Sequence, residues 1–165
     1  MNAYSDAQGS APHIRNLQEL VHDPYFSKRK LSEPAYCPEC RAVYKAGRWV
    51  WGALAADAHI TLCPACQRIK DHCPAGFLTL SGEFLRDHSE NILQLLRNIE
   101  QHEKAEHPLK RLMALVSNAD GSIEATFTDP HLARAIGEAI RDAYRGHLEY
   151  SYQAGEYFLR VKWTR

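Results

Sequence analysis

Two Cys-x-x-Cys pairs, Cys37-Pro-Glu-Cys40 and Cys63-Pro-Ala-Cys66, are separated by 22 residues in this chain. Each such turn directs two sulfurs toward one centre, so two turns can supply the four thiolates of a tetrahedral metal site. The spacing is close to that of zinc ribbons. We therefore predict one Zn²⁺ ion bound by Cys37, Cys40, Cys63 and Cys66. Because four thiolates complete the coordination sphere, the metal would be structural, and its binding energy would help to fold residues 36–76.

Other interpretations of these cysteines have weaker support in the sequence. Thioredoxin-like redox motifs are expected at a strand-to-helix junction of a βαβ unit, and neither pair has that setting. Iron in a four-cysteine site is an alternative to zinc, and colour separates the two because a ferric tetrathiolate is red. The fifth cysteine, Cys73, is interpreted as a small, partly buried thiol near the metal; the alternatives are a replacement ligand and a redox sensor.

Length and composition set outer limits on the class of protein. The chain has 165 residues, 45% of them hydrophobic and 24% charged, which fits one ordinary domain or two very small ones. These values exclude a disordered or collagen-like protein. No apolar run approaches the roughly 18–20 residues of a membrane span, and residues 1–11 lack the basic start and apolar stretch of a secretion signal. We therefore expect a cytoplasmic protein with no membrane partner.

The net charge of zero conceals an uneven distribution of charge. Residues 28–70 contain eight basic and three acidic residues, a net charge of +5, whereas residues 81–106 carry −3. A zinc ion with four thiolates adds −2, so the basic block would still hold about +3. Such a local excess of positive charge can attract an anionic partner.

Hydrophobic patterning predicts an α+β chain in four parts. Residues 1–34 form a flexible basic arm, and residues 35–80 form an N-terminal four-cysteine zinc ribbon with a hairpin turning near Gly47. Residues 81–107 form a long amphipathic linking helix, because apolar side chains recur on one helical face. Residues 108–165 form a small α+β domain, a β-β-α-β-β layer whose single helix covers one face of an antiparallel sheet.

Local signals give further detail within these parts. A third short ribbon strand is expected at residues 59–62, and the linking helix ends before Pro108. In the last part, Asp129 and Pro130 predict the start of a helix that ends before Gly146. On the final strand one face is expected to carry Tyr157, Leu159, Val161 and Trp163. The opposite face carries Phe158, Arg160 and Lys162, and it is either a solvated edge or a row that contacts a partner.

Two patterns resemble enzyme sites and fail on geometry. His102 and His107 are five residues apart, which places them about 140° apart around a helix, whereas a zinc-protease motif needs histidines at i and i+4. The second cysteine pair resembles half of a zinc deaminase site, but no histidine upstream of it has a glutamate two residues on. There is also no phosphate-binding glycine loop. We therefore predict no catalytic activity and no small-molecule substrate.

Aromatic and basic residues gather in the arm and the ribbon. Trp49 and Trp51 are expected on one face of the hairpin, either as core residues or as a platform on which bases stack. Lysine and arginine residues around them could bind phosphate. The candidate RNA-binding residues are Lys28, Arg29, Lys30, Lys45, Arg48, Trp49, Trp51, Arg68 and Lys70.

Six stretches within about residues 33–165 together resemble a known family. They are Glu33-Pro-Ala-Tyr-Cys-Pro-Glu-Cys40, Gly47-Arg-Trp-Val-Trp51, Cys63-Pro-Ala-Cys-Gln-Arg-Ile69, Pro74-Ala-Gly76, Ser117-Asn-Ala-Asp-Gly121 and Thr128-Asp-Pro-His-Leu-Ala-Arg-Ala-Ile-Gly137. The chain resembles in them the NMD-type family, whose eukaryotic member is the nuclear export adaptor of the large ribosomal subunit, and most of all small bacterial proteins described as affecting ribosome stability and mRNA decay. His131-Leu-Ala-Arg134 lies where the larger proteins have a helix rich in His, Ala and Arg, but those proteins also carry more Cys-x-x-Cys pairs and further domains.

Together the residues and the resemblance predict a non-catalytic, zinc-stabilised protein that associates with RNA or the ribosome and acts in ribosome stability or stress. Ribosomes or structured RNA are the expected partners. One alternative is a protein–protein adaptor that binds its partner through the long helix and never contacts nucleic acid. The other is a redox protein with iron at the four cysteines.

Overall fold

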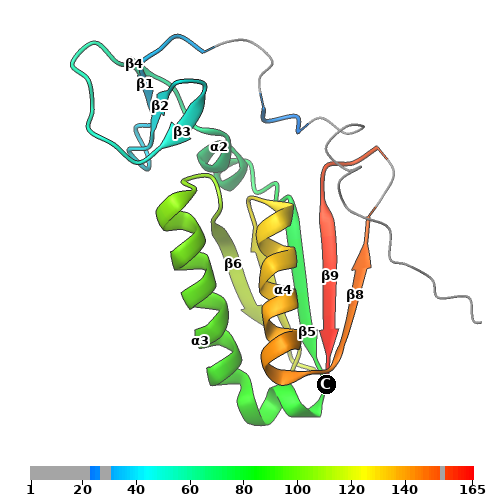
Figure 1. Cartoon of the computed structure of the whole chain (residues 1–165). Helices are drawn as coiled ribbons and strands as arrows, with labels where there is room; N and C mark the ends of the chain where they lie inside the picture. The colour runs from blue at the N-terminus through cyan, green and yellow to red at the C-terminus, as the bar shows by residue number, and fades with distance from the viewer. Residues whose placement is uncertain (1–22, 27–30, 153–154) are drawn as a thin grey trace, which may run out of the picture.

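The computed structural model describes residues 23–26, 31–152 and 155–165. Most of the predicted arm, including Lys28, Arg29 and Lys30, lies outside the described residues. The described chain is a mixed α+β protein with three helices and two sheets, one small and one large (Figure 1). This confirms the predicted fold class, but the arrangement of the elements differs from the predicted one.

The small sheet has the strand order β3-β2-β1-β4. Its strands are β1 (Ala35–Tyr36), β2 (Val43–Lys45), β3 (Arg48–Val50) and β4 (His59–Ile60). The β2–β3 hairpin turns at Ala46 and Gly47, which have φ angles of 51° and 77°. Two successive positive φ angles are typical of a type I′ turn, so the predicted hairpin is confirmed. Strand β4 is shorter than predicted and pairs in parallel with β1.

A helix that the sequence analysis did not predict follows β4. Helix α2 (Pro64–Lys70) contains the second cysteine pair and begins after Cys63, whose sulfur accepts a hydrogen bond from the N–H of Cys66. Proline at the first helical position is a common start signal. The helix has only seven residues, too few for a helical period to stand out in the sequence.

The large sheet has the strand order β6-β7-β5-β9-β8. Its central strand, β5 (Gly76–Ser81), pairs antiparallel with β7 and parallel with β9. The prediction that residues 76–80 belong to the zinc ribbon is wrong, because they form part of the five-stranded sheet. Leu78 and Leu80 are buried and alternate with less buried residues, the signal of a strand in a half-buried sheet. The other strands are β6 (Leu112–Ser117), β7 (Ile123–Phe127), β8 (His147–Ser151) and β9 (Leu159–Thr164).

Two helices cover the same face of the large sheet (Figure 1). Helix α3 (Glu83–Glu106) matches the predicted long helix closely and helix α4 (Pro130–Tyr144) matches the predicted C-terminal one. However, α3 does not act as a linker, because Leu85, Ile92 and Leu96 are fully buried in the core that α4 and the sheet share. The predicted β-β-α-β-β order is confirmed as β6-β7-α4-β8-β9. It is not a separate antiparallel layer with one helix, because β5 lies between β7 and β9, pairs in parallel with β9, and α3 shares the core. Among the described residues, no helix is long and apolar enough to cross a membrane.

The start of α4 gives a first testable prediction. Asp129 caps the helix, since its Oδ1 accepts a hydrogen bond of 2.9 Å from the N–H of Leu132. Replacing Asp129 by alanine removes this acceptor and should lower the free energy of unfolding by about 1 kcal/mol. Urea unfolding measures the change. Asp57→Ala, in an exposed loop, is the control, and an equal loss in both variants would contradict the capping role.

Candidate metal centre

The four predicted ligands form a cluster. The sulfurs of Cys37, Cys40, Cys63 and Cys66 all lie within 4.8 Å of one another. The sulfurs of Cys40 and Cys63 are 3.7 Å apart, and a tetrahedral site with metal–sulfur bonds of about 2.3 Å requires a separation of about 3.8 Å. The cluster therefore has the size that a tetrathiolate metal site needs, as the sequence predicted.

Each cysteine pair closes its own tight turn. In the first, the N–H of Arg41 donates to the carbonyl of Cys37 at 2.8 Å, and Arg41 takes a positive φ of 65°. In the second, Cys63 sits at the start of α2 and the N–H of Cys66 points at its sulfur. The parallel pairing of β1 with β4 then brings the two turns together.

Burial makes two of the thiols, those of Cys63 and Cys66, resist ionisation. Burial raises the pKa of Cys66 to about 11, although a hydrogen bond from Arg111 opposes the change. Burial also raises the pKa of Cys63. For Cys37, backbone N–H groups outweigh burial and bring the pKa down to about 7. A divalent metal ion at this site would offset the cost of ionising the buried thiols of Cys63 and Cys66.

Arg111 is a site residue that the sequence analysis missed. It is only 8% exposed, and its Nη1 and Nη2 donate to the sulfurs of Cys66 and Cys63 at 3.2 and 3.5 Å. Its Nε donates to the carbonyl of Pro108 at 2.7 Å, which fixes the guanidinium plane. Burial acts to lower the pKa of Arg111, but the hydrogen bond to Cys66 and the neighbouring thiolates outweigh it and raise the pKa. An arginine just before an apolar strand carries no local signal of such a role.

Arg68 is buried and structural. It is 2% exposed and pairs with Asp23 at 2.5 Å, while its guanidinium lies 4.3 Å from the ring centre of Tyr25. These contacts attach residues 23–26 to α2, so this described part of the predicted flexible arm is anchored. Arg68 cannot reach a phosphate group from this buried position, so its prediction as an RNA-binding residue is wrong. Cys73 is exposed and lies outside the metal cluster, contrary to the expectation of a partly buried thiol near the metal.

The two tryptophans do not form a shared platform. Trp49 is 7% exposed and packs on Tyr44 in the core around the cysteines, with ring centres 5.4 Å apart. Trp51 lies beyond the end of β3, is 39% exposed and donates from its indole N–H to the carbonyl of Lys104 at 2.6 Å. The regular alternation of a strand ends before Trp51, so the two rings take different environments. The remaining described candidates, Lys45, Arg48 and Lys70, are exposed.

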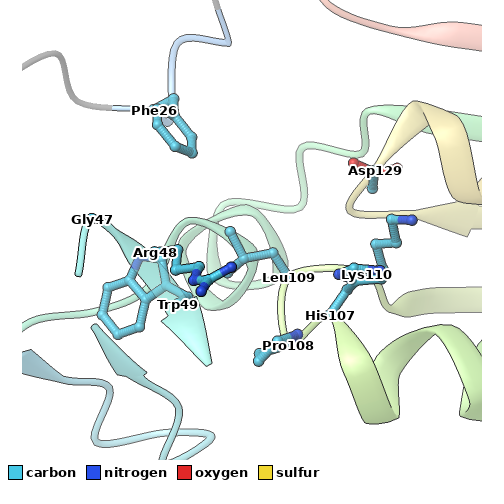
Figure 2. Close-up of a pocket in the computed structure, with 9 residues that line it drawn as sticks. All are labelled: Phe26, Gly47, Arg48, Trp49, His107, Pro108, Leu109, Lys110 and Asp129. Carbon is cyan, nitrogen blue, oxygen red and sulfur yellow. The ribbon is translucent and has the colours of Figure 1, made fainter. Parts of the chain in front are cut away.

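A small pocket of about 230 Å³ lies at the seam between the hairpin and the start of α4. Arg48 and Lys110 line it from different elements, with Leu109 between them (Figure 2). Lys110 is held by Glu103 at 2.6 Å, so Arg48 is the more available cation. The pocket is lined by Phe26, Gly47, Arg48, Trp49, His107, Pro108, Leu109, Lys110 and Asp129.

No protein-family model matches this chain, and no curated protein matches it at a significant level.

Proposed function

We propose that this chain is a non-catalytic, zinc-stabilised protein that binds RNA and associates with the ribosome. The closed cluster of Cys37, Cys40, Cys63 and Cys66 is the observation that carries this proposal. Four sulfurs leave no open coordination position for water or substrate, which favours a structural metal over a catalytic one. Zinc is the usual ion in such four-cysteine sites, and iron is the competitor that elemental analysis separates from it.

The RNA-binding part is supported by the positions of basic residues around this cluster. Lys45 and Arg48 are paired across the β2–β3 hairpin, and both side chains are exposed. Lys70, at the end of α2, is also exposed. Contacts from such residues to phosphate do not depend on base sequence, and they suit a protein that recognises structured RNA. The resemblance of the cysteine motifs to NMD-type proteins adds the ribosome as the expected RNA.

Salt dependence tests this proposal. Binding of the purified protein to ribosomal RNA, measured by fluorescence anisotropy, should weaken steeply between low and physiological salt, because each phosphate contact releases counterions. In a plot of log K against log salt concentration, the double variant Lys45→Ala/Arg48→Ala should reduce the magnitude of the negative slope by about two. A triple alanine variant at Lys28, Arg29 and Lys30 tests the rest of the predicted surface in the same way.

Arg86→Ala/Arg97→Ala, which removes two exposed cations from α3, is the matched control and should leave the slope unchanged. Absence of RNA binding at low salt would refute the proposed function. Co-sedimentation with ribosomes that survives nuclease and high salt would instead indicate a protein partner.

A further inference from the structure

One face of the large sheet carries no described helix or strand. Helices α3 and α4 lie on the other face (Figure 1), and along β9 the exposed residues Arg160 and Lys162 alternate with the buried Leu159, Val161 and Trp163. The exposed side chains thus form the open face of the sheet, to which the sequence analysis had assigned Phe158, Arg160 and Lys162.

The strand register gives the order of residues across this open face. Phe77 on β5 lies between Thr126 on β7 and Arg160 on β9, and Arg160 lies next to Ser151 on β8. Phe158 comes just before β9, and its side chain lies on the open face too, since its ring contacts the ring of Phe77. We call Phe77, Phe158 and Arg160 the aromatic cluster.

The aromatic cluster has a defined geometry. The rings of Phe77 and Phe158 have centres 5.8 Å apart and are inclined by 76°. The guanidinium carbon of Arg160 lies 4.5 Å from the centre of the Phe77 ring and 4.9 Å from that of Phe158. Among the described residues no carboxylate forms a salt bridge with Arg160. As far as the described part of the chain goes, its charge and N–H donors are free to contact an anionic ligand that also offers flat rings.

Charge on the neighbouring row limits where such a ligand can lie. There Thr79 is flanked by Glu124 on one side and by Lys162 on the other, and Glu149 lies opposite Lys162 in the strand register. The two carboxylates repel phosphate at this level, whereas the row of Phe77 carries only Arg160 as a charged group. An anionic chain is expected to cross the sheet along the row of the aromatic cluster.

We propose that the aromatic cluster binds single-stranded RNA by stacking unpaired bases on Phe77 and Phe158, with Arg160 contacting the adjoining phosphate. Phe77 and Phe158 are half-buried, and aromatic rings beside an arginine can stack bases of any sequence, because every base has a flat face. The hydroxyl groups of Thr126 and Ser151 on the same row can hydrogen-bond a ribose 2′-OH, which favours RNA over DNA. This inference rests on the proposed function and places a second RNA contact on the sheet, away from the cysteines.

The test uses the full chain with a ten-nucleotide oligouridine, the matching oligothymidine and an RNA duplex. Affinity is measured by fluorescence anisotropy. Phe158→Ala/Arg160→Ala should weaken oligouridine binding at least tenfold and leave duplex binding unchanged. Phe158→Tyr keeps a ring to stack and should retain binding within about twofold. Phe158 and Arg160 lie outside the hydrophobic core, so the thermal unfolding midpoint of each variant should stay close to that of the wild type.

A second pair of variants separates this inference from the proposed function. Arg86→Ala/Arg97→Ala, on the exposed side of α3, is the control and should leave oligouridine binding unchanged. If Lys45→Ala/Arg48→Ala weakens oligouridine binding while Phe158→Ala/Arg160→Ala does not, the aromatic cluster is refuted and RNA binding through the hairpin stands. If the wild type binds the duplex but not oligouridine, the aromatic cluster alone is refuted. If Phe158→Ala/Arg160→Ala weakens binding of oligothymidine as much as binding of oligouridine, the preference for RNA is refuted. A wild type that binds no RNA at low salt refutes both proposals.

Discussion

Removal of the metal by a strong chelator should unfold the small sheet and leave the large sheet folded. The strands of the small sheet have only two or three residues, and its buried core consists of Cys37, Cys63 and Cys66 with Ala42, Trp49 and Ala65. Structural zinc contributes about 10–16 kcal/mol in zinc-finger peptides, comparable to the whole stability of a domain, about 5–15 kcal/mol. Without it this core has too little apolar area to fold.

Hydrogen exchange measures this effect segment by segment. Amides of β1 to β4 and α2 should lose protection after chelation, whereas amides of β5, β7 and β9 should keep it. Cys63→Ser should reproduce the loss, because it removes a fully buried ligand. Cys73→Ser, at the exposed cysteine outside the cluster, is the matched control. Native protein without bound metal, with a melting curve unchanged by chelator, would contradict the whole account.

Replacement of Arg111 by methionine should lower the stability of the protein and speed the loss of its metal, the second largest effect after removal of the metal itself. Methionine has similar length but no charge, so the two sulfurs that Arg111 contacts would lose their only described cationic partner. Loss of one partner from a buried charge pair costs about 3 kcal/mol or more. The variant should unfold at lower urea concentration and transfer its metal to a chromophoric chelator faster than the wild type.

Arg111→Lys separates charge from geometry. Lysine keeps the charge but has no planar fork to reach both sulfurs, so its metal transfer should be intermediate between wild type and Arg111→Met. Arg97→Met, on the exposed side of α3, should transfer metal as the wild type does. A rate of metal transfer that is the same in all four proteins would show that Arg111 only fills space.

Signals that act over a few residues predicted their part of the structure well. The helical period of residues 81–107 and the cap at Asp129 both operate within one or two turns, and α3 and α4 begin and end close to the expected positions. The Cys-x-x-Cys turns are equally local, so the ligand set could be identified before any tertiary contact was known. Helix α2 was missed because its start signal, Cys63-Pro64, was interpreted only as part of a metal turn.

By itself, the sequence determined the fold class, the two long helices and the four cysteines that form the candidate metal site, because those features depend on neighbouring residues along the chain. The tertiary structure alone decided that β5 is the central strand of the large sheet and that Arg68 and Arg111 are buried. It also decided that Phe77 and Phe158 meet on the open face. Burial and pairing of this kind arise when segments distant in the sequence pack together, and an arginine or phenylalanine carries the same local pattern whether or not a partner lies across from it.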